Sequence, residues 1–179
     1  MMNLARLAMN DTNFNKIQDL GTGTRGDIYL GIDDKGTVAA LKYIRSKEYK
    51  EQKQFMKEVG ILAGIDHPSI IKMIGYVLKA SAPDHKGLPC IITEYMPNDT
   101  LRVVYQKIQE GDIPNGWNAT AKSKIAFGVA AGMAYLYQKQ AIHSLTLRPD
   151  KIFLDFNLEP KINGLALSQN DLNISSFKY

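Results

Sequence analysis

The chain has 179 residues, of which 45% are hydrophobic, so it is long enough to bury a core and has the composition of a globular protein. Its net charge of +4 is modest, and no block of Lys and Arg interleaved with aromatic residues points to a nucleic-acid partner. The single cysteine, Cys90, excludes an internal disulfide. No stretch reaches the roughly 18 consecutive apolar residues of a membrane span, so we expect a cytoplasmic protein.

A glycine-rich segment, LGTGTRGDIYLG, begins at Leu20 and predicts two strands joined by a turn. Gly21, Gly23 and Gly26 have the GxGxxG spacing, in which missing Cβ atoms let backbone N–H groups approach phosphate oxygens. On spacing alone, an ordinary turn between strands is favoured. Ile28 and the residues after it are typical of a strand and not of a helix start, which excludes the dinucleotide-binding form of the motif.

The next strand is predicted over the apolar run from Val38 to Ile44. Alternation along a strand places Ala40 and Lys42 on one face and Leu41 on the other. A lysine inside such a run is either a charge that protects an edge strand from pairing or a functional cation.

A helix is predicted over Glu48–Ala63, because its apolar residues recur at i, i+4 and i+7: Phe55, Val59 and Leu62. Glu58 falls on the same inward side, where a carboxylate needs a partner. Lys42 is the natural candidate, and we expect the two groups to approach within salt-bridge distance. The alternative is that Glu58 lies at the border of the apolar face and stays in contact with water.

Two further strands, Ile70–Val77 and Leu88–Thr93, complete a predicted sheet of five antiparallel strands with one helix. A short helix is predicted over Leu101–Ile108. A longer amphipathic helix follows, marked by Ile125, Val129, Met133 and Leu136.

Together these segments resemble the N-terminal part of a eukaryotic protein kinase domain. LGTGTRGDIY looks like its phosphate-covering loop, AALK like its VAIK strand, FMKEVGILAGIDHPSIIKMIGY like its helix C and the following turn, and ITEYMPNDTL like its hinge. The resemblance implies an α+β, kinase-like fold: a five-stranded antiparallel small lobe with one helix, then a partial, mainly helical large lobe. We expect an N-terminal extension over 1–13, the small lobe and hinge over 14–97, and a truncated large lobe over 98–179 that ends at the start of the activation segment.

The resemblance also implies an ATP site. Lys42 would grip the α and β phosphates and pair with Glu58, Thr93 would occupy the gatekeeper position, and the backbone from Glu94 to Met96 would face the adenine edge. The full set of implied nucleotide-binding residues is Leu20, Gly21, Gly23, Gly26, Ile28, Ala40, Lys42, Glu58, Thr93, Glu94 and Met96.

The catalytic motifs depart from the family pattern. AIHSLTLRPDKIFLD stands where IHRDLKPENILLD would be, so the base position falls on Leu145 or Thr146, and neither side chain accepts a proton as a carboxylate does. Lys151 replaces the metal-binding Asn. PKINGLALS replaces PKISDFGLA, which puts Gly164, or with a gap Asn163, at the metal-binding Asp position. We expect no intact base and no metal site.

Three hypotheses follow. The first is a pseudokinase that binds ATP weakly, with little magnesium dependence, and acts through protein partners. The second is an atypical active Ser/Thr or Tyr kinase that transfers the γ-phosphate of ATP to protein, and the third is a non-functional truncated kinase copy. A general base contributes roughly 10² to 10⁴ in rate, so its loss favours the first. We also expect the apolar face of the long helix to be exposed or covered by a partner.

Overall fold

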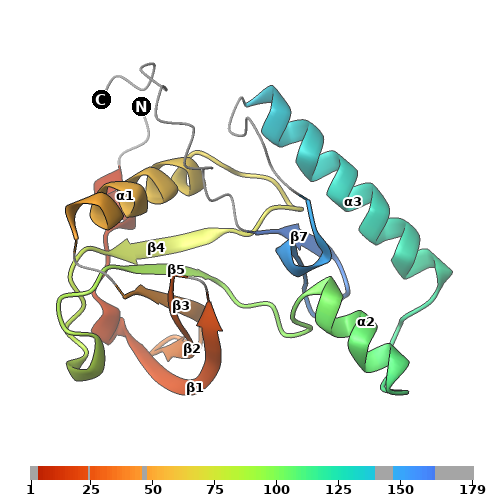
Figure 1. Ribbon diagram of the computed structural model, residues 1–179, viewed down its shortest axis with the longest axis horizontal. Helices are drawn as coiled ribbons and strands as arrows, with labels where there is room; N and C mark the ends of the chain where they lie inside the picture. Colours follow the sequence, from red (N-terminus) through yellow and green to blue (C-terminus); the bar gives the residue numbers. More distant parts are fainter. Residues whose placement is uncertain (1–3, 24, 46–47, 140–146, 164–179) are drawn as a thin grey trace. The chain divides into compact units, whose positions relative to one another are not determined.

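The computed structural model describes residues 4–23, 25–45, 48–139 and 147–163. The chain divides into two compact units, of which the first comprises residues 1–66 and 71–95 and the second residues 67–70 and 96–179. In the described ranges, the first unit contains the larger sheet and one long helix, and the second contains two α-helices and a short hairpin (Figure 1). Within the described ranges, no helix combines the length and hydropathy needed to cross a membrane.

The first unit is organised around a five-stranded sheet in which every pairing is antiparallel, in the order β1-β2-β3-β5-β4. The strands are β1 (Phe14–Gly23), β2 (Gly26–Asp33), β3 (Val38–Ile44), β4 (Met73–Val77) and β5 (Cys90–Glu94). The predicted strand number and direction are confirmed. β4 starts three residues later than predicted, because Ile70 instead forms an isolated bridge with Ile162.

Helix α1 (Tyr49–Ala63) packs on this sheet next to β4 (Figure 1). Phe55, Val59 and Leu62 are all buried, as their spacing predicts. The ring of Phe55 meets the ring of Tyr76 on β4 at a centroid distance of 6.3 Å. The inward face of α1 is therefore fixed against the sheet, which determines where its remaining inward side chain, Glu58, can reach.

Residues 4–13, which precede β1, are integrated into the first unit. They form two short 3-10 helices, η1 (Leu4–Leu7) and η2 (Asp11–Asn13). The Met9 N–H donates to the Tyr76 carbonyl of β4 at 2.8 Å. The buried carboxylate of Asp11 accepts hydrogen bonds from the N–H groups of Ser81 and Ala82, at 2.8 and 3.0 Å. These bonds tie residues 9–11 to β4 and to the segment that follows it.

The free cysteine is a core residue. Cys90 is fully buried in a cluster formed by β1, β3, β4 and β5. Burial raises the pKa of its thiol well above the ordinary value, so the group stays protonated. Cys90 is therefore a packing residue and not a reactive thiol.

The second unit consists of α2 (Leu101–Gln109), α3 (Ala119–Gln138), η4 (Pro149–Lys151), β6 (Ile152–Leu154) and β7 (Pro160–Ile162), together with residues 67–70. Both helices start at residues that cap them: the Thr100 hydroxyl accepts from the Val103 N–H, and the Asn118 side-chain oxygen accepts from the Ala121 N–H. Their shared core contains Val104, Ala121, Ile125, Leu154 and Leu158.

The apolar face of α3 is covered, so the expectation that it would be exposed is wrong. Ile125 and Leu136 are buried. The hairpin of β6 and β7 and the segment around Ser69 lie against this face, and the Ile162 N–H donates to the Ser69 carbonyl at 2.8 Å. The sequence analysis considered only exposure or a partner and overlooked the hairpin, which is made of very short strands.

Two glycines of α3 permit this close packing. A Cβ added at Gly128 would lie 2.6 Å from Pro160 Cγ, and one added at Gly132 would lie 2.9 Å from Ile162 Cδ1. Both distances are below ordinary contact, so the absence of side chains lets β7 approach the helix. The large apolar side chains that α3 does expose are Phe127 and Tyr137, at 78% and 65%.

We predict that Gly128→Ala and Gly60→Ala change stability in opposite directions. Gly128→Ala adds a methyl group that overlaps Pro160, which outweighs the gain in helix propensity and should cost about 1–2 kcal/mol. Gly60 of α1 has nothing within 4 Å of an added Cβ, so Gly60→Ala should stabilise by about 0.5–1 kcal/mol. Urea unfolding measures both, and a stabilising Gly128→Ala would contradict the packing described for α3.

Candidate functional site

The glycine-rich segment forms the tip of the hairpin between β1 and β2, and its glycines serve different purposes. Gly21 has a φ of +107°, a conformation that disfavours other residues. A Cβ added at Gly26 would lie 1.8 Å from the Tyr43 carbonyl oxygen, so this glycine allows β2 to approach β3. Around Gly23 the nearest atom to an added Cβ is 3.4 Å away. Backbone geometry therefore accounts for two of the three glycines without reference to a ligand.

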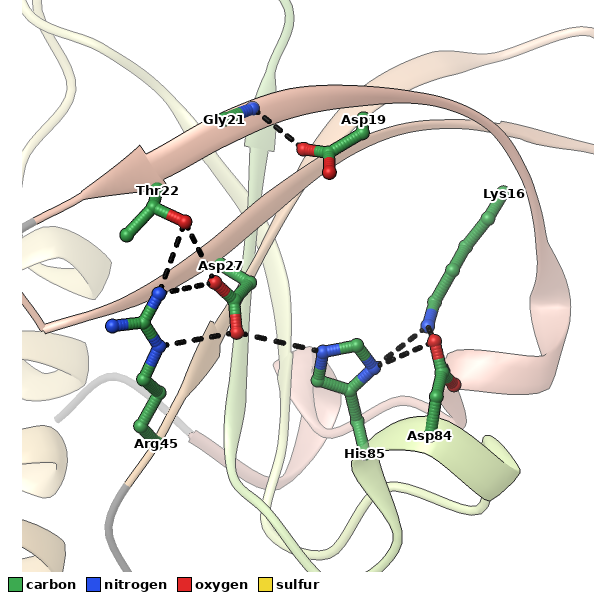
Figure 2. Close-up of polar contacts among 8 residues, drawn as sticks. All are labelled: Lys16, Asp19, Gly21, Thr22, Asp27, Arg45, Asp84 and His85. Atoms are coloured by element: carbon green, nitrogen blue, oxygen red, sulfur yellow. Dashed lines mark hydrogen bonds and ion pairs between the residues drawn. The ribbon is translucent and has the colours of Figure 1, made fainter.

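A network of side chains fastens the turn to the end of β3 (Figure 2). The Thr22 hydroxyl donates to Asp27 Oδ1 at 3.0 Å, and Arg45 donates from Nε to Asp27 Oδ2 at 3.2 Å and from Nη2 to the Thr22 oxygen at 3.0 Å. The hydrogen bond from Arg45, followed by that from Thr22, lowers the pKa of Asp27 to about 2. We call these three residues the turn clamp.

The network continues toward the 3-10 helix η3 (Pro83–His85). Lys16 Nζ of β1 lies 2.9 Å from both Asp84 Oδ2 and His85 Nδ1, and His85 Nε2 lies 3.9 Å from Asp27 Oδ2 (Figure 2). The Lys16 ammonium also sits over the ring of Tyr43, 4.4 Å from its centroid. Side-chain contacts therefore hold the pair of strands β1 and β2 near both of its ends: the turn clamp acts at the glycine-rich turn, and Lys16 acts near the start of β1.

The sequence analysis missed the turn clamp. The strand register brings its three residues together. Thr22 is directly opposite Asp27, and Gly26 is opposite Ile44, so Arg45, the residue after Ile44, lies at the same end of the sheet. Residue types alone do not reveal that register. It follows from the irregularities in the β1 and β2 pairing, which shift the alignment between Lys16 and Gln18 and again between Asp19 and Gly21.

Lys42 occupies the central strand of the sheet. β3 lies between β2 and β5, with Lys42 opposite Ile28 on one side and Ile91 on the other. This position excludes the alternative of a charge that protects an edge strand, because β3 has no free edge. Lys42 is instead directed from the middle of a sheet face toward α1, where Glu58 meets it.

The predicted approach of Lys42 and Glu58 is confirmed, with Lys42 Nζ 3.3 Å from Glu58 Oε1. Glu58 also has a second partner that the sequence analysis did not foresee: Arg25, in the glycine-rich turn, donates from Nη2 to Glu58 Oε2. The side chains of Glu58, Arg25 and Lys42 are 11%, 22% and 29% exposed. One carboxylate therefore holds two cations, and we call this group the ion triad.

Several other implied site residues share a sheet face with Lys42. Residues directly opposite each other in a sheet point to the same side, as do residues two apart along a strand. Ile28 is opposite Lys42, and Ala40, two residues before Lys42, is opposite Thr93. Ile28, Ala40, Lys42 and Thr93 therefore form one half-buried surface. Their role in nucleotide binding stays a prediction.

The remaining implied residues lie in different surroundings. Leu20 is 36% exposed near the turn. Glu94 is joined to Lys72: its N–H donates to the Lys72 carbonyl at 3.0 Å, and its Oε1 accepts from the Lys72 N–H at 2.7 Å. The Glu94 N–H is therefore occupied, and an adenine edge would have to meet other backbone groups of this segment. Met96 is buried in the second unit.

Two of the positions that the sequence analysis predicts to be degenerate, Lys151 and Asn163, are described, and they are neighbours. The Asn163 N–H donates to the Lys151 carbonyl at 2.8 Å across the base of the β6 and β7 hairpin. Leu145, Thr146 and Gly164 lie outside the described residues. In the ranges that are described, no three His, Cys, Asp or Glu side chains are grouped to hold a metal ion.

Asp150 is the acidic residue nearest in sequence to Leu145 and Thr146, the two candidates for the base position. Arg148 donates to both of its carboxylate oxygens at 2.8 Å, from Nε and Nη2. This pairing lowers the pKa of Asp150, whereas a general base that works near neutral pH needs a raised one. Asp150 is therefore poorly suited to act as a general base.

Comparison with known proteins agrees with this architecture. A family model described as protein tyrosine and serine/threonine kinase matches residues 14–176. A probable leucine-rich repeat receptor-like serine/threonine-protein kinase of Arabidopsis thaliana is 26% identical over 170 residues, which cover 94% of this chain and 16% of the relative. Cysteine-rich receptor-like protein kinase 24 of the same plant is 28% identical over 161 residues, which cover 88% of this chain and 24% of the relative. The chain thus spans less than a quarter of the length of either.

Among solved structures, an apo pseudokinase has a TM-score of 0.72 and 17% identity, with coverage of 89% of this chain and 59% of that chain. At this identity the likeness shows the fold alone. It confirms the predicted kinase-like α+β fold.

We predict that Glu58→Gln destabilises the protein by about 1–3 kcal/mol, because it leaves Lys42 and Arg25 together without their carboxylate. Glu51→Gln, on the same helix, is the matched control and should change stability by no more than about 0.5 kcal/mol. Urea unfolding provides the measurement. Equal effects of the two substitutions would mean that the ion triad does not stabilise the fold.

We predict a pH-dependent effect of Asp27→Asn. The folded-state pKa of Asp27, about 2, lies below the ordinary value, so its ionised form stabilises the fold fully above roughly pH 4, and this contribution is lost as the pH falls toward 2. The difference in urea midpoint between wild type and Asp27→Asn should therefore shrink from pH 5 to pH 2. Asp34→Asn, in the exposed turn after β2, is the control. A constant difference for Asp27→Asn over this range would argue against the turn clamp.

Proposed function

This chain belongs to the protein tyrosine and serine/threonine kinase family, and we propose that it is a pseudokinase-like module that binds ATP weakly, without a metal ion, and transfers no phosphate. The ion triad carries the proposal. In the resemblance described above, Lys42 lies at the position that grips the nucleotide phosphates and Glu58 at the position that pairs with this lysine, and the two side chains are in contact.

The residues of the first unit suit a nucleotide. Ile28 and Ala40 offer a half-buried apolar surface on which an adenine ring can stack, beside the Lys42 ammonium. The glycine-rich turn lies close by along the chain, with the turn clamp holding it to β3. Bound ATP would supply a polyphosphate with several negative charges, and Lys42 would compensate part of that charge.

The residues do not suit magnesium. Hard divalent cations prefer carboxylate and other oxygen ligands. Of the two described positions that would provide them, one carries the ammonium of Lys151 and the other the neutral amide of Asn163, and a backbone hydrogen bond holds these residues side by side. A cation at this point opposes the binding of another. We therefore derive no step through a metal ion.

A domain that binds a nucleotide without turnover acts through what it contacts. We propose that the domain acts by binding protein partners. The exposed aromatic side chains of α3, Phe127 and Tyr137, are available for such contacts in the second unit.

An atypical active kinase is the second candidate, and the intact pair of Lys42 and Glu58 favours it, since the family requires this contact for catalysis. Against it stand the side chains at the base position, Leu145 or Thr146, and the cation at Lys151. Loss of a general base alone costs roughly 10² to 10⁴ in rate. The two candidates differ in phosphotransfer and agree on ATP binding.

We predict that ATP raises the melting temperature in the presence of EDTA. At a ligand concentration a hundredfold above Kd the stabilisation is about 2.7 kcal/mol, which corresponds to a shift of several degrees. Lys42→Ala should abolish most of the shift. No shift with millimolar ATP, or a shift that requires Mg²⁺, would contradict the proposal.

The same preparation distinguishes the two candidates. With excess Mg²⁺ and Mn²⁺ and radiolabelled ATP, we expect no transfer to the chain or to a generic protein substrate. Transfer that Lys42→Ala abolishes would overturn the pseudokinase proposal and establish the atypical kinase.

A further inference from the structure

The ion triad has an excess of positive charge. Arg25 and Lys42 each contact a different oxygen of Glu58, so two cations share one anion and one positive charge remains. All three side chains are less than one third exposed. A charge that is partly removed from water is costly unless another group compensates it. The triad as it stands is therefore suited to receive an anion.

Arg25 has hydrogen-bonding capacity to spare. A guanidinium has several N–H donors arranged in a planar fork, and a carboxylate or phosphate can accept from two of them at once. Among the described residues, Glu58 is the only side chain recorded as accepting from Arg25, through a single nitrogen. The other donors remain for a ligand.

The backbone holds Arg25 in place. The Arg45 N–H donates to the Arg25 carbonyl at 3.1 Å, and the Arg45 side chain forms the turn clamp with Thr22 and Asp27. Gly26, the next residue, is packed against the backbone of β3. The guanidinium therefore extends from a fixed point beside the central strand, so binding an anion there requires little additional ordering.

We propose that Arg25 is a second phosphate-binding cation, which together with Lys42 compensates the negative charge of a nucleotide polyphosphate that a divalent ion would otherwise neutralise. This inference rests on the proposed nucleotide site and names the group that makes the site independent of metal. Glu58 keeps the two cations together, since without a shared anion they would repel each other.

This arrangement makes the phosphates the main determinant of selectivity. Adenosine has no phosphate for Arg25 to bind, whereas ADP and ATP do. Inorganic tripolyphosphate has the phosphates without the base, so it tests the pair of cations separately from the rest of the nucleotide site.

The experiment is calorimetric titration in EDTA of the full chain with ATP, adenosine and tripolyphosphate. Arg25→Ala removes the cation, Arg25→Lys keeps the charge and removes the fork, and Arg6→Ala, an exposed arginine on η1, is the matched control. Melting curves without ligand verify that each variant is folded.

We expect Arg25→Ala to weaken ATP and tripolyphosphate binding by about tenfold and to leave adenosine binding within about twofold of wild type. Arg25→Lys should lie between wild type and Arg25→Ala, and Arg6→Ala should match wild type. Unchanged ATP affinity in Arg25→Ala would overturn the inference and leave the proposed function standing. Tighter ATP binding would also overturn it, because Arg25 would then obstruct the site.

The proposed function can fail separately. If tripolyphosphate binds in an Arg25-dependent manner and neither ATP nor adenosine binds more tightly than this inorganic anion, the site is an anion site and the nucleotide proposal is wrong. If none of the three ligands binds to wild type, both proposals are refuted.

Discussion

The carboxylate of Glu58 is the contact on which the arrangement of the first unit depends. It joins three elements that are far apart in sequence: the glycine-rich turn through Arg25, the central strand through Lys42, and helix α1, which carries Glu58 itself. Because two cations share it, neutralising this one carboxylate would release both and set them against each other. As far as the described residues show, the apolar cluster around Cys90 does not include the turn.

Packing determines where that carboxylate lies. Phe55 and Val59 fix the rotation of α1 on the sheet, and Glu58 then faces β3. From the other side, Gly26 lets β2 approach β3 closely enough for the turn clamp to form at the end of the strands. The hydrophobic packing of α1 and the backbone contacts of β2 therefore place Arg25 next to Glu58. The two charged groups meet because these contacts fix the positions of the backbone segments that carry them.

Much of this arrangement could be predicted from the sequence, where periodicity reflects burial. The spacing of Phe55, Val59 and Leu62 predicts α1 and the side on which Glu58 lies, and the apolar run around Lys42 predicts the strand β3. Arg25 was not foreseen, because residues in a turn have no periodicity and the direction of a long side chain depends on tertiary packing. The cover over α3 was missed for a related reason, since strands as short as β6 and β7 leave almost no pattern.

The central claim is that protein cations, and not a metal ion, compensate the phosphates of a bound nucleotide. The most direct test is the affinity for ATP as a function of free Mg²⁺ concentration at fixed pH and ionic strength. If Lys42 and Arg25 bind the phosphates, Mg²⁺ competes with them for the same charge, so the affinity for total ATP should stay level or fall as Mg²⁺ is added. An affinity that rises with Mg²⁺ would show that the metal ion is part of the site and would contradict the account.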